Sequence, residues 1–226
     1  MLCADGRGER AGCMGVVSKA YDYASAHRDE LIAATERHLL LVAIALGIGI
    51  VVCVPLGVVT SRSRVASVTV INGFNALRVI PSLAILFLAL PYFGLSLRSA
   101  LLALTILALP PILINTDAAF RTIDPAIREA AVGMGMARQE VLRRIEFPLA
   151  APVIIAGIRT ATVEVIASAT LAAFIGGGGL GIYITRGFAL YDNAILLVGA
   201  IPVALLALIA EIGMSGLQRA LQPPTH

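Results

Sequence analysis

Long apolar runs with few or no charged residues alternate with polar stretches along this sequence of 226 residues. A helix needs about 20 apolar residues to cross the hydrocarbon core of a bilayer, and five runs approach or exceed that length. Each run contains a proline, and we expect Pro81 to interrupt the second run and the pair Pro110 and Pro111 to kink or end the third. The pattern predicts an all-α membrane protein with about five transmembrane helices, six being the alternative. The expected spans are residues 39–61, 65–90, 99–116, 149–175 and 194–216.

The composition supports a membrane location. Hydrophobic residues make up 58% of the chain and charged residues only 14%, against about 25% charged residues in soluble proteins. The three cysteines show no Cys-x-x-Cys spacing, so the sequence indicates no metal or redox site. The net charge of +3 comes mostly from arginines in the loops. We therefore interpret this charge as a sign of topology and not of nucleic-acid binding.

Basic residues in the short loops set the orientation, because Lys and Arg stay on the cytoplasmic side of a membrane. Two loops and the C-terminal end hold eight arginines, whereas the two opposite loops hold Arg98 and Arg186. We expect the polar loop 117–148 and the tail 221–226 in the cytoplasm and the N-terminal tail 1–34 outside. Four basic residues in that N-terminal tail, and Arg37 just after it, argue against this orientation. The first fourteen residues lack the apolar core of a signal peptide, and Met1 and Met14 are both candidate starts.

The polar loop is too long to be a mere connector in a compact chain. Asp124 followed by Pro125 is a helix start, with Asp as the N-cap and Pro in the first turn. We predict one short helix from there to about residue 134, a bend at the two glycines that follow, and a second helix over about 137–147 that stops at Pro148. From periodicity alone, a protein-docking protrusion and an amphipathic helix lying on the anionic inner leaflet explain the loop equally well.

A fixed pattern of residues runs through this loop: Glu-Ala-Ala, then Gly after three residues, then Ile after nine more and Pro three positions later. It resembles the EAA loop of ABC importer permeases, with Phe147 in place of the usual Leu. A lipid-facing helix has no need of this spacing, which favours docking of an ATPase. By this resemblance, residues 35–220 form one transmembrane domain of the type I importer permease fold. The residues that the motif assigns to ATPase coupling are Glu129, Ala130, Ala131, Gly135, Ile145 and Pro148.

Other segments narrow the resemblance. "IPSLAIL" from Ile80 and "TLAAFIGGGGLG" from Thr170 are similar to permeases that import osmoprotectants such as glycine betaine, carnitine, choline or proline betaine. The resemblance implies a multi-pass protein of a bacterial cell membrane that works with cytoplasmic ATPase subunits, a second permease copy or paralogue and an extracellular substrate-binding protein. It implies that this chain is no enzyme and holds no cofactor, since the partner ATPase binds ATP and Mg²⁺.

Several alternatives stay open. The chain would also suit import of another small solute, such as methionine or a sulfonate, and the sequence does not decide which compatible solute is carried. A membrane enzyme would require a cluster such as G-x-S-x-G or H-E-x-x-H, which the sequence lacks, and we expect all three histidines outside the spans. A membrane scaffold would not need ionisable residues within its spans.

Polar residues inside the expected spans mark a candidate translocation path. Ionisable groups within a membrane are costly and usually face a cavity or a partner. A polar stripe recurs at helical spacing around Arg78, and a second one follows Glu164. The alternative is a structural role for these residues, in interhelical hydrogen bonds and ion pairs. The candidate path residues are Asn72, Asn75, Arg78, Ser82, Arg159, Glu164 and Ser168.

A run of glycines near residue 180 satisfies the spacing G-x-G-x-x-G. A dinucleotide-binding site also needs an acidic residue about 20 positions on, but Ile201 lies there, and no P-loop sequence occurs in the chain. We therefore expect an external turn that acts as a gate or docking loop, or a tight re-entrant turn without substrate contact. Its residues are Gly176, Gly177, Gly178, Gly179 and Gly181.

Overall fold

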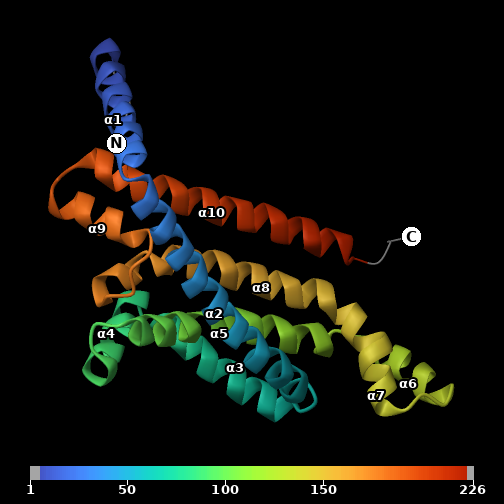
Figure 1. The fold of residues 1–226 in the computed structure, drawn as a ribbon. Coiled ribbons are helices and arrows are strands. Elements are labelled where there is room, and N and C mark those ends of the chain that lie inside the picture. Colours follow the sequence, from blue (N-terminus) through green and yellow to red (C-terminus); the bar gives the residue numbers. More distant parts are fainter. Residues whose placement is uncertain (1–5, 223–226) are drawn as a thin grey trace.

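The computed structural model describes residues 6–222, with side chains described from Gly15 onward. Every regular element in these residues is a helix (Figure 1). The helices follow one another as α1 (Gly6–Ala26), α2 (Arg28–Thr60), α3 (Arg64–Val79), α4 (Ser82–Phe93), α5 (Leu97–Arg121), α6 (Pro125–Gly133), α7 (Arg138–Val141), the π turn η1 (Leu142–Glu146), α8 (Phe147–Ala169), the 3₁₀ turn η2 (Leu171–Ile175), α9 (Gly181–Ala189) and α10 (Asn193–Ala220).

Within the described residues, four helices are long and apolar enough to cross a membrane, and a bent pair of helices raises the number to as many as five. The four are α2, α5, α10 and the continuous helix Arg138–Ala169. This architecture confirms the all-helical fold with four to five spans. Helix α2 begins at Arg28 and so extends well ahead of the expected start of the first span.

The expected second span is not one straight helix. Helices α3 and α4 meet at a bend of 92°. The bend follows from Pro81, because a residue before proline is pushed out of the helical region and Ile80 accordingly adopts φ −74° and ψ 123°. The chain therefore turns within the apolar run and presents the end of α3 and the beginning of α4 at one place.

Helix α5 lies at the centre of the bundle and packs against α2, α3, α4 and α8. Its side chains include some of the most deeply buried of the structure, among them Leu104, Ile112 and Phe120. Small residues allow the neighbouring backbones to approach closely: a Cβ added at Gly157 of α8 would lie 2.7 Å from the carbonyl oxygen of Pro111 in α5. The proline pair that we expected near the end of the third span lies inside α5, which continues to Arg121.

The second helix of the polar loop does not stop at Pro148. Helix α7, the π turn η1 and α8 form one uninterrupted helix from Arg138 to Ala169. In a π turn the bond spans five residues, and the N–H of Phe147 reaches the carbonyl oxygen of Leu142. This wider turn precedes Pro148 in the first turn of α8 and accommodates the proline without a break.

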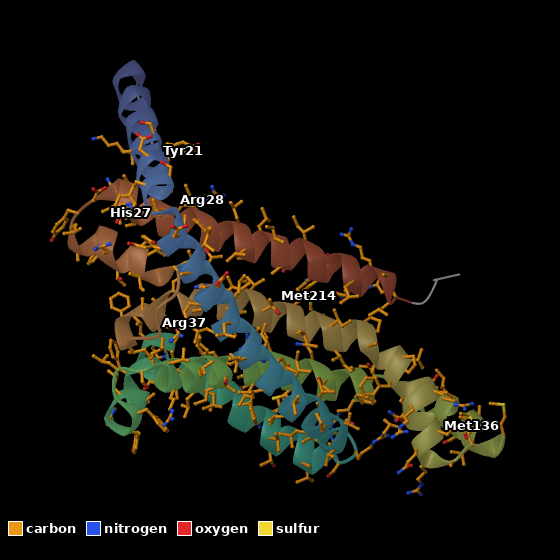
Figure 2. All side chains as sticks on the ribbon, in the orientation of Figure 1. Tyr21, His27, Arg28, Arg37, Met136 and Met214 are labelled. Atoms are coloured by element: carbon orange, nitrogen blue, oxygen red, sulfur yellow. The ribbon has the colours of Figure 1, made fainter. Side chains whose placement is uncertain are left out.

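The N-terminal segment, expected to be a tail, is helical from Gly6 onward and turns directly into α2. Ala20 of α1 belongs to one buried apolar cluster with Tyr183 of α9 and with Ala194 and Val198 of α10, and α1 packs mainly on α10. Figure 1 shows α1, α9 and α4 at one end of the bundle and α6 and α7 at the other, and Figure 2 places Met136 at the tip of the protruding polar loop. The two ends of the bundle are therefore built from different parts of the chain.

Candidate functional site

A cavity of about 200 Å³ lies at the bend between α3 and α4. Arg78 reaches it from the last turn of α3, Ser82 from the first turn of α4, and Glu164 and Ser168 from α8. The last two are four residues apart and therefore share one helix face. The structure thus gathers four of the predicted path residues, which come from two regions distant in the sequence, around a single space.

The other three predicted path residues lie elsewhere. Asn72 and Asn75 are exposed on α3 and do not line this cavity. Arg159 turns to α10, where its Nε lies 3.4 Å from Oε1 of Glu211 and its Nη1 donates to Gln218 at 3.2 Å. The Arg159 contacts join α8 to α10 and match the alternative interpretation, in which polar residues within the spans hold the helices together.

Helix α6 of the polar loop begins and ends with capping interactions. The Asp124 side chain accepts a hydrogen bond from the N–H of Ala126 at 2.9 Å, as an N-cap does. At the other end the N–H of Gly135 donates to Val132 and that of Met136 to Ala131, which is the Schellman arrangement. Gly135 has φ +88°, so the glycine of the motif is the residue that ends the helix.

The predicted coupling face of α6 is largely open to solvent. Ala131 is buried, but Glu129, Ala130 and Ile127 are exposed, and Met134 is 75% exposed. An exposed apolar helix face at the tip of a protrusion is typical of a protein-docking surface. The two remaining motif residues sit where the second helix enters the bundle: Ile145 is partly buried in η1, and Pro148 is exposed in the first turn of α8.

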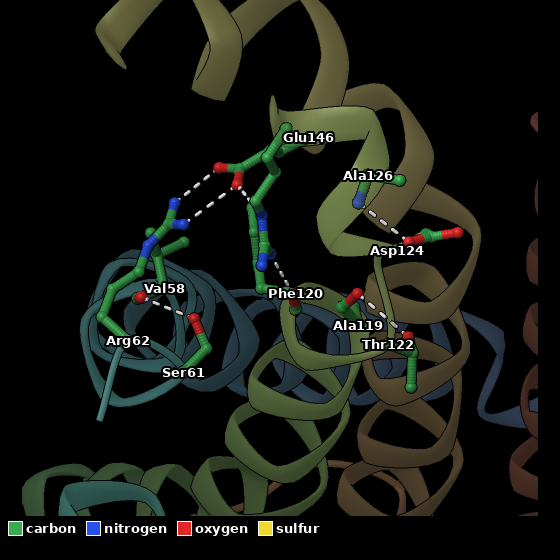
Figure 3. A network of polar contacts seen from close by, with 10 residues as sticks. Val58, Ser61, Arg62, Ala119, Phe120, Thr122, Asp124, Ala126 and Glu146 are labelled. Carbon is green, nitrogen blue, oxygen red and sulfur yellow. Dashed lines mark hydrogen bonds and ion pairs between the residues drawn. The ribbon is translucent and has the colours of Figure 1, made fainter. Parts of the chain in front are cut away.

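Glu146 is a functional candidate that the sequence analysis missed. Its carboxylate is buried, with 2% of the residue exposed. It accepts from Arg62 in the turn between α2 and α3, at 2.9 and 2.5 Å, and from Nε of Arg128 in α6 (Figure 3). Arg128 also donates to the carbonyl oxygen of Phe120 at the end of α5. The hydrogen bond to Glu146 raises the pKa of the Arg62 guanidinium. The Glu146 carboxylate therefore joins the protruding loop to the turn between α2 and α3, and Arg128 joins it to the end of α5.

A second buried carboxylate lies at the same end of the bundle. Asp117 of α5 is 1% exposed and accepts hydrogen bonds from the hydroxyl groups of Thr60 and Ser67, each at 2.8 Å. These hydroxyls belong to α2 and α3, so the carboxylate fixes three helices together. The signal available in the sequence was an acidic residue directly after an apolar run, which does not by itself name a partner.

The glycine-rich turn lies at the opposite end of the bundle, between η2 and α9. Gly176, Gly178 and Gly179 adopt φ between +78° and +79°, a region that favours glycine. A Cβ added at Gly181 would lie 2.0 Å from the carbonyl oxygen of Thr170, so the turn closes tightly on itself. These contacts account for the glycines as structural requirements of a tight turn.

Two side chains of α2 bond to this turn and to the end of α8 that leads toward it. Nε of Arg37 donates to the carbonyl oxygen of Gly177 at 3.4 Å. His38, which we expected outside the spans, is fully buried inside α2, and its Nε2 donates to the carbonyl oxygen of Ile166 at 3.2 Å. The expectation was wrong because α2 begins at Arg28, ahead of the apolar run from residue 39 on which the span was based.

Comparison with known proteins gives a consistent assignment. The family described as binding-protein-dependent transport system inner membrane component matches residues 45–223. The chain is 42% identical to the choline transport system permease protein OpuBB of Bacillus subtilis over 86% of this chain and 89% of that one. It is 42% identical to the carnitine transport permease protein OpuCB of Listeria monocytogenes over 85% and 88%. It is 38% identical to the osmoprotectant import permease protein OsmW of Salmonella typhimurium over 85% and 92%.

Solved structures agree on the fold. A chain of the MetNI methionine ABC transporter in an inward-facing conformation superposes with a TM-score of 0.76 at 22% sequence identity, covering 85% of this chain and 96% of that one. This likeness concerns the arrangement of helices and not the solute. The helical bundle, the protruding loop with its EAA pattern and the match over residues 45–223 together show that the chain belongs to the binding-protein-dependent transport system inner membrane components.

Proposed function

We propose that this chain is the permease subunit of an ATP-driven importer for compatible solutes such as glycine betaine, carnitine, choline or proline betaine. The observation that carries the proposal is the identity of about 40% to permeases named for choline, carnitine and osmoprotectants, over most of both chains. A permease for methionine or a sulfonate is the runner-up, but the likeness to the methionine transporter rests on 22% identity and supports the fold alone.

The protruding loop is the proposed contact with a cytoplasmic ATPase. The exposed face of α6, with Glu129, Ala130 and Met134, offers an apolar surface next to an acidic group. Gly135 ends this helix cleanly, and Ile145 and Pro148 lie where the second helix enters the bundle. Closure of the ATPase subunits would move α6, and the Glu146 cluster would pass that movement to α2, α3 and α5. ATP and Mg²⁺ belong to the ATPase in this scheme.

A second permease, either another copy or a paralogue, completes the proposed path. Asn72 and Asn75 are exposed on α3, and amide groups facing lipid tails are costly. A neighbouring permease across this polar stripe would remove that cost. An extracellular binding protein would deliver solute at the end that carries the glycine-rich turn, in a bacterial cell membrane.

The experiment that tests this function is uptake of radiolabelled glycine betaine, choline and carnitine by salt-stressed cells that lack their own osmolyte importers. The cells receive this chain together with the ATPase, binding protein and any second permease encoded beside it. We expect uptake of at least one solute and its loss in Gly135→Asp, because Asp at φ +88° strains the end of α6 and adds a charge to the exposed surface proposed for docking. Gly15→Asp, in α1 outside the spans and with open space around its Cβ, controls for the added charge.

Two results would contradict the proposal. An assembled complex that imports none of the three solutes would remove the osmoprotectant class. Uptake that survives Gly135→Asp unchanged would remove the coupling role of the loop.

A further inference from the structure

Two opposite charges line the cavity at the α3–α4 bend without pairing. Within the described residues, neither Arg78 nor Glu164 takes part in an ion pair within 4.0 Å. By contrast Arg159, five positions before Glu164 on the same helix, reaches Glu211 of α10. Charged side chains within a membrane normally pair with each other or face a space that holds water or solute. The cavity is the space that these two charges share.

The cavity has the size and lining for a small solute with both polar and apolar parts. Its volume of about 200 Å³ is below the range of about 300 to 1,000 Å³ typical of drug-sized ligands. Two hydroxyl groups stand beside the charges, from Ser82 and Ser168, and the rest of the lining is mostly aliphatic, including Ile85, Ile106 and Pro110. A solute of few heavy atoms with charges at its two ends and methyl groups between them suits this lining.

We propose that this cavity is a transient subsite for zwitterions, in which Arg78 takes a carboxylate and Glu164 takes a quaternary ammonium group. The proposal rests on the proposed function and assigns the solute class of its path. A guanidinium forms paired hydrogen bonds with a carboxylate. A trimethylammonium group has no N–H to donate, so a carboxylate attracts it by charge alone while its methyl groups lie against the aliphatic lining.

We expect binding at this subsite to be weak because of the residues that line it. High affinity for a quaternary ammonium group requires a cage of aromatic rings, and no residue that lines the cavity is aromatic. Weak binding suits a transport path, because a solute that binds tightly leaves slowly. The subsite therefore sorts solutes during passage and does not store them.

If Arg78 and Glu164 contact the solute, replacing one of them should affect some solutes more than others. If they only stabilised the fold, replacing either should affect all solutes equally. Glycine betaine and carnitine carry both a carboxylate and a quaternary ammonium group, whereas choline carries the ammonium group and a hydroxyl. Arg78 should therefore matter for the first two and much less for choline. Glu164 should matter for all three.

The first test is uptake by the importer carrying Arg78→Gln or Glu164→Gln, with Arg64→Gln as matched control, since Arg64 is an exposed arginine at the start of the same helix. We expect Arg78→Gln to lower uptake of glycine betaine about tenfold and that of choline less than about twofold, because the lost bonds are charge-assisted. Glu164→Gln should lower uptake of both. An equal loss of both solutes in Arg78→Gln, or no loss in either, overturns the proposal.

A second test does not need transport. In the purified full-length chain with Cys3, Cys13 and Cys53 replaced by serine, a Ser168→Cys variant is labelled with a methanethiosulfonate bearing a trimethylammonium group or with one bearing a sulfonate. We expect faster labelling by the cationic reagent, loss of this preference with Glu164→Gln, and slower labelling in the presence of glycine betaine. Equal rates for the two reagents refute a cation site at Glu164.

The two tests separate the subsite from the proposed function. If the complete importer takes up none of the three solutes while glycine betaine still slows labelling of the cavity, the proposed import function is wrong and the subsite stands. If the importer takes up glycine betaine while this solute leaves labelling unchanged, the subsite is wrong and the import function stands.

Discussion

Replacing Glu146 by Gln tests whether one buried carboxylate holds the polar loop to the bundle. Glutamine keeps the size and one accepting oxygen but removes the charge, so the paired contact with Arg62 and the bond from Arg128 cannot both persist at full strength. Removing one partner of a fully buried ion pair costs about 3 to 5 kcal/mol. The side chain of Arg62 is 44% exposed and that of Arg128 is 30% exposed, so neither guanidinium is fully stranded.

We therefore expect Glu146→Gln to lower the free energy of unfolding by about 2 kcal/mol, below the range for a fully buried pair. For a chain of this size that corresponds to a fall in Tm of about 4 to 8 °C. The assay is thermal unfolding of the purified chain in detergent, accompanied by hydrogen exchange of the α6 amides. These amides should exchange faster in the variant, because α6 loses its tether.

Glu140→Gln is the matched control. Glu140 lies in the same loop and pairs with Arg144 at 3.1 Å, but these side chains are 37% and 75% exposed. Exposed pairs contribute at most about 1 kcal/mol, so Tm should change by less than half as much. Equal effects of the two variants on Tm, or unchanged exchange at α6 in Glu146→Gln, would refute the tethering role.

Two further changes test contacts inside the bundle. Asp117→Ala removes the common acceptor of two buried hydroxyl groups and should lower the free energy of unfolding by about 2 to 3 kcal/mol, measured as a lower Tm in detergent. A Tm within about 2 °C of the parent would show that the carboxylate has no structural role. Gly181→Ala places a Cβ 2.0 Å from the carbonyl oxygen of Thr170 and should cost about 3 kcal/mol. Gly213→Ala, with open space around its Cβ, should leave Tm unchanged, and equal yields of folded protein from both alanine variants would contradict the tight turn.

The spans and the loop were predictable because their signals are local. Long apolar runs with few charges located the spans, and Asp124 with Pro125 marked the start of α6. Pro81 predicted an interruption of the second span, but the angle of 92° between α3 and α4 depends on how α4 packs against α5 and η2. A proline usually ends a helix, and Pro148 did not, because the π turn before it is a feature of the backbone that no residue pattern marks.

The polar clusters were not predictable because their members are far apart in the sequence. Arg62 and Glu146 lie 84 positions apart, and Ser67 and Asp117 lie 50 apart. Each residue looked like an ordinary loop or helix-end charge until the fold brought the partners together. The convergence of Arg78 with Glu164 follows the same rule, since helical spacing places each on a stripe but does not say that the stripes meet.

If the polar loop moves as proposed, the unbroken helix from Arg138 to Ala169 is a lever with its pivot at Glu146, where two arginines hold it. Glu164 lies 18 residues beyond that pivot, which at about 1.5 Å per residue places the carboxylate about 27 Å away along the axis. A rotation of about 10° around the pivot then displaces Glu164 sideways by about 5 Å, by the same helix geometry. That stroke is comparable to the width of a small solute, so a modest tilt at the end that carries the polar loop would be enough to open or close the space between Glu164 and Arg78.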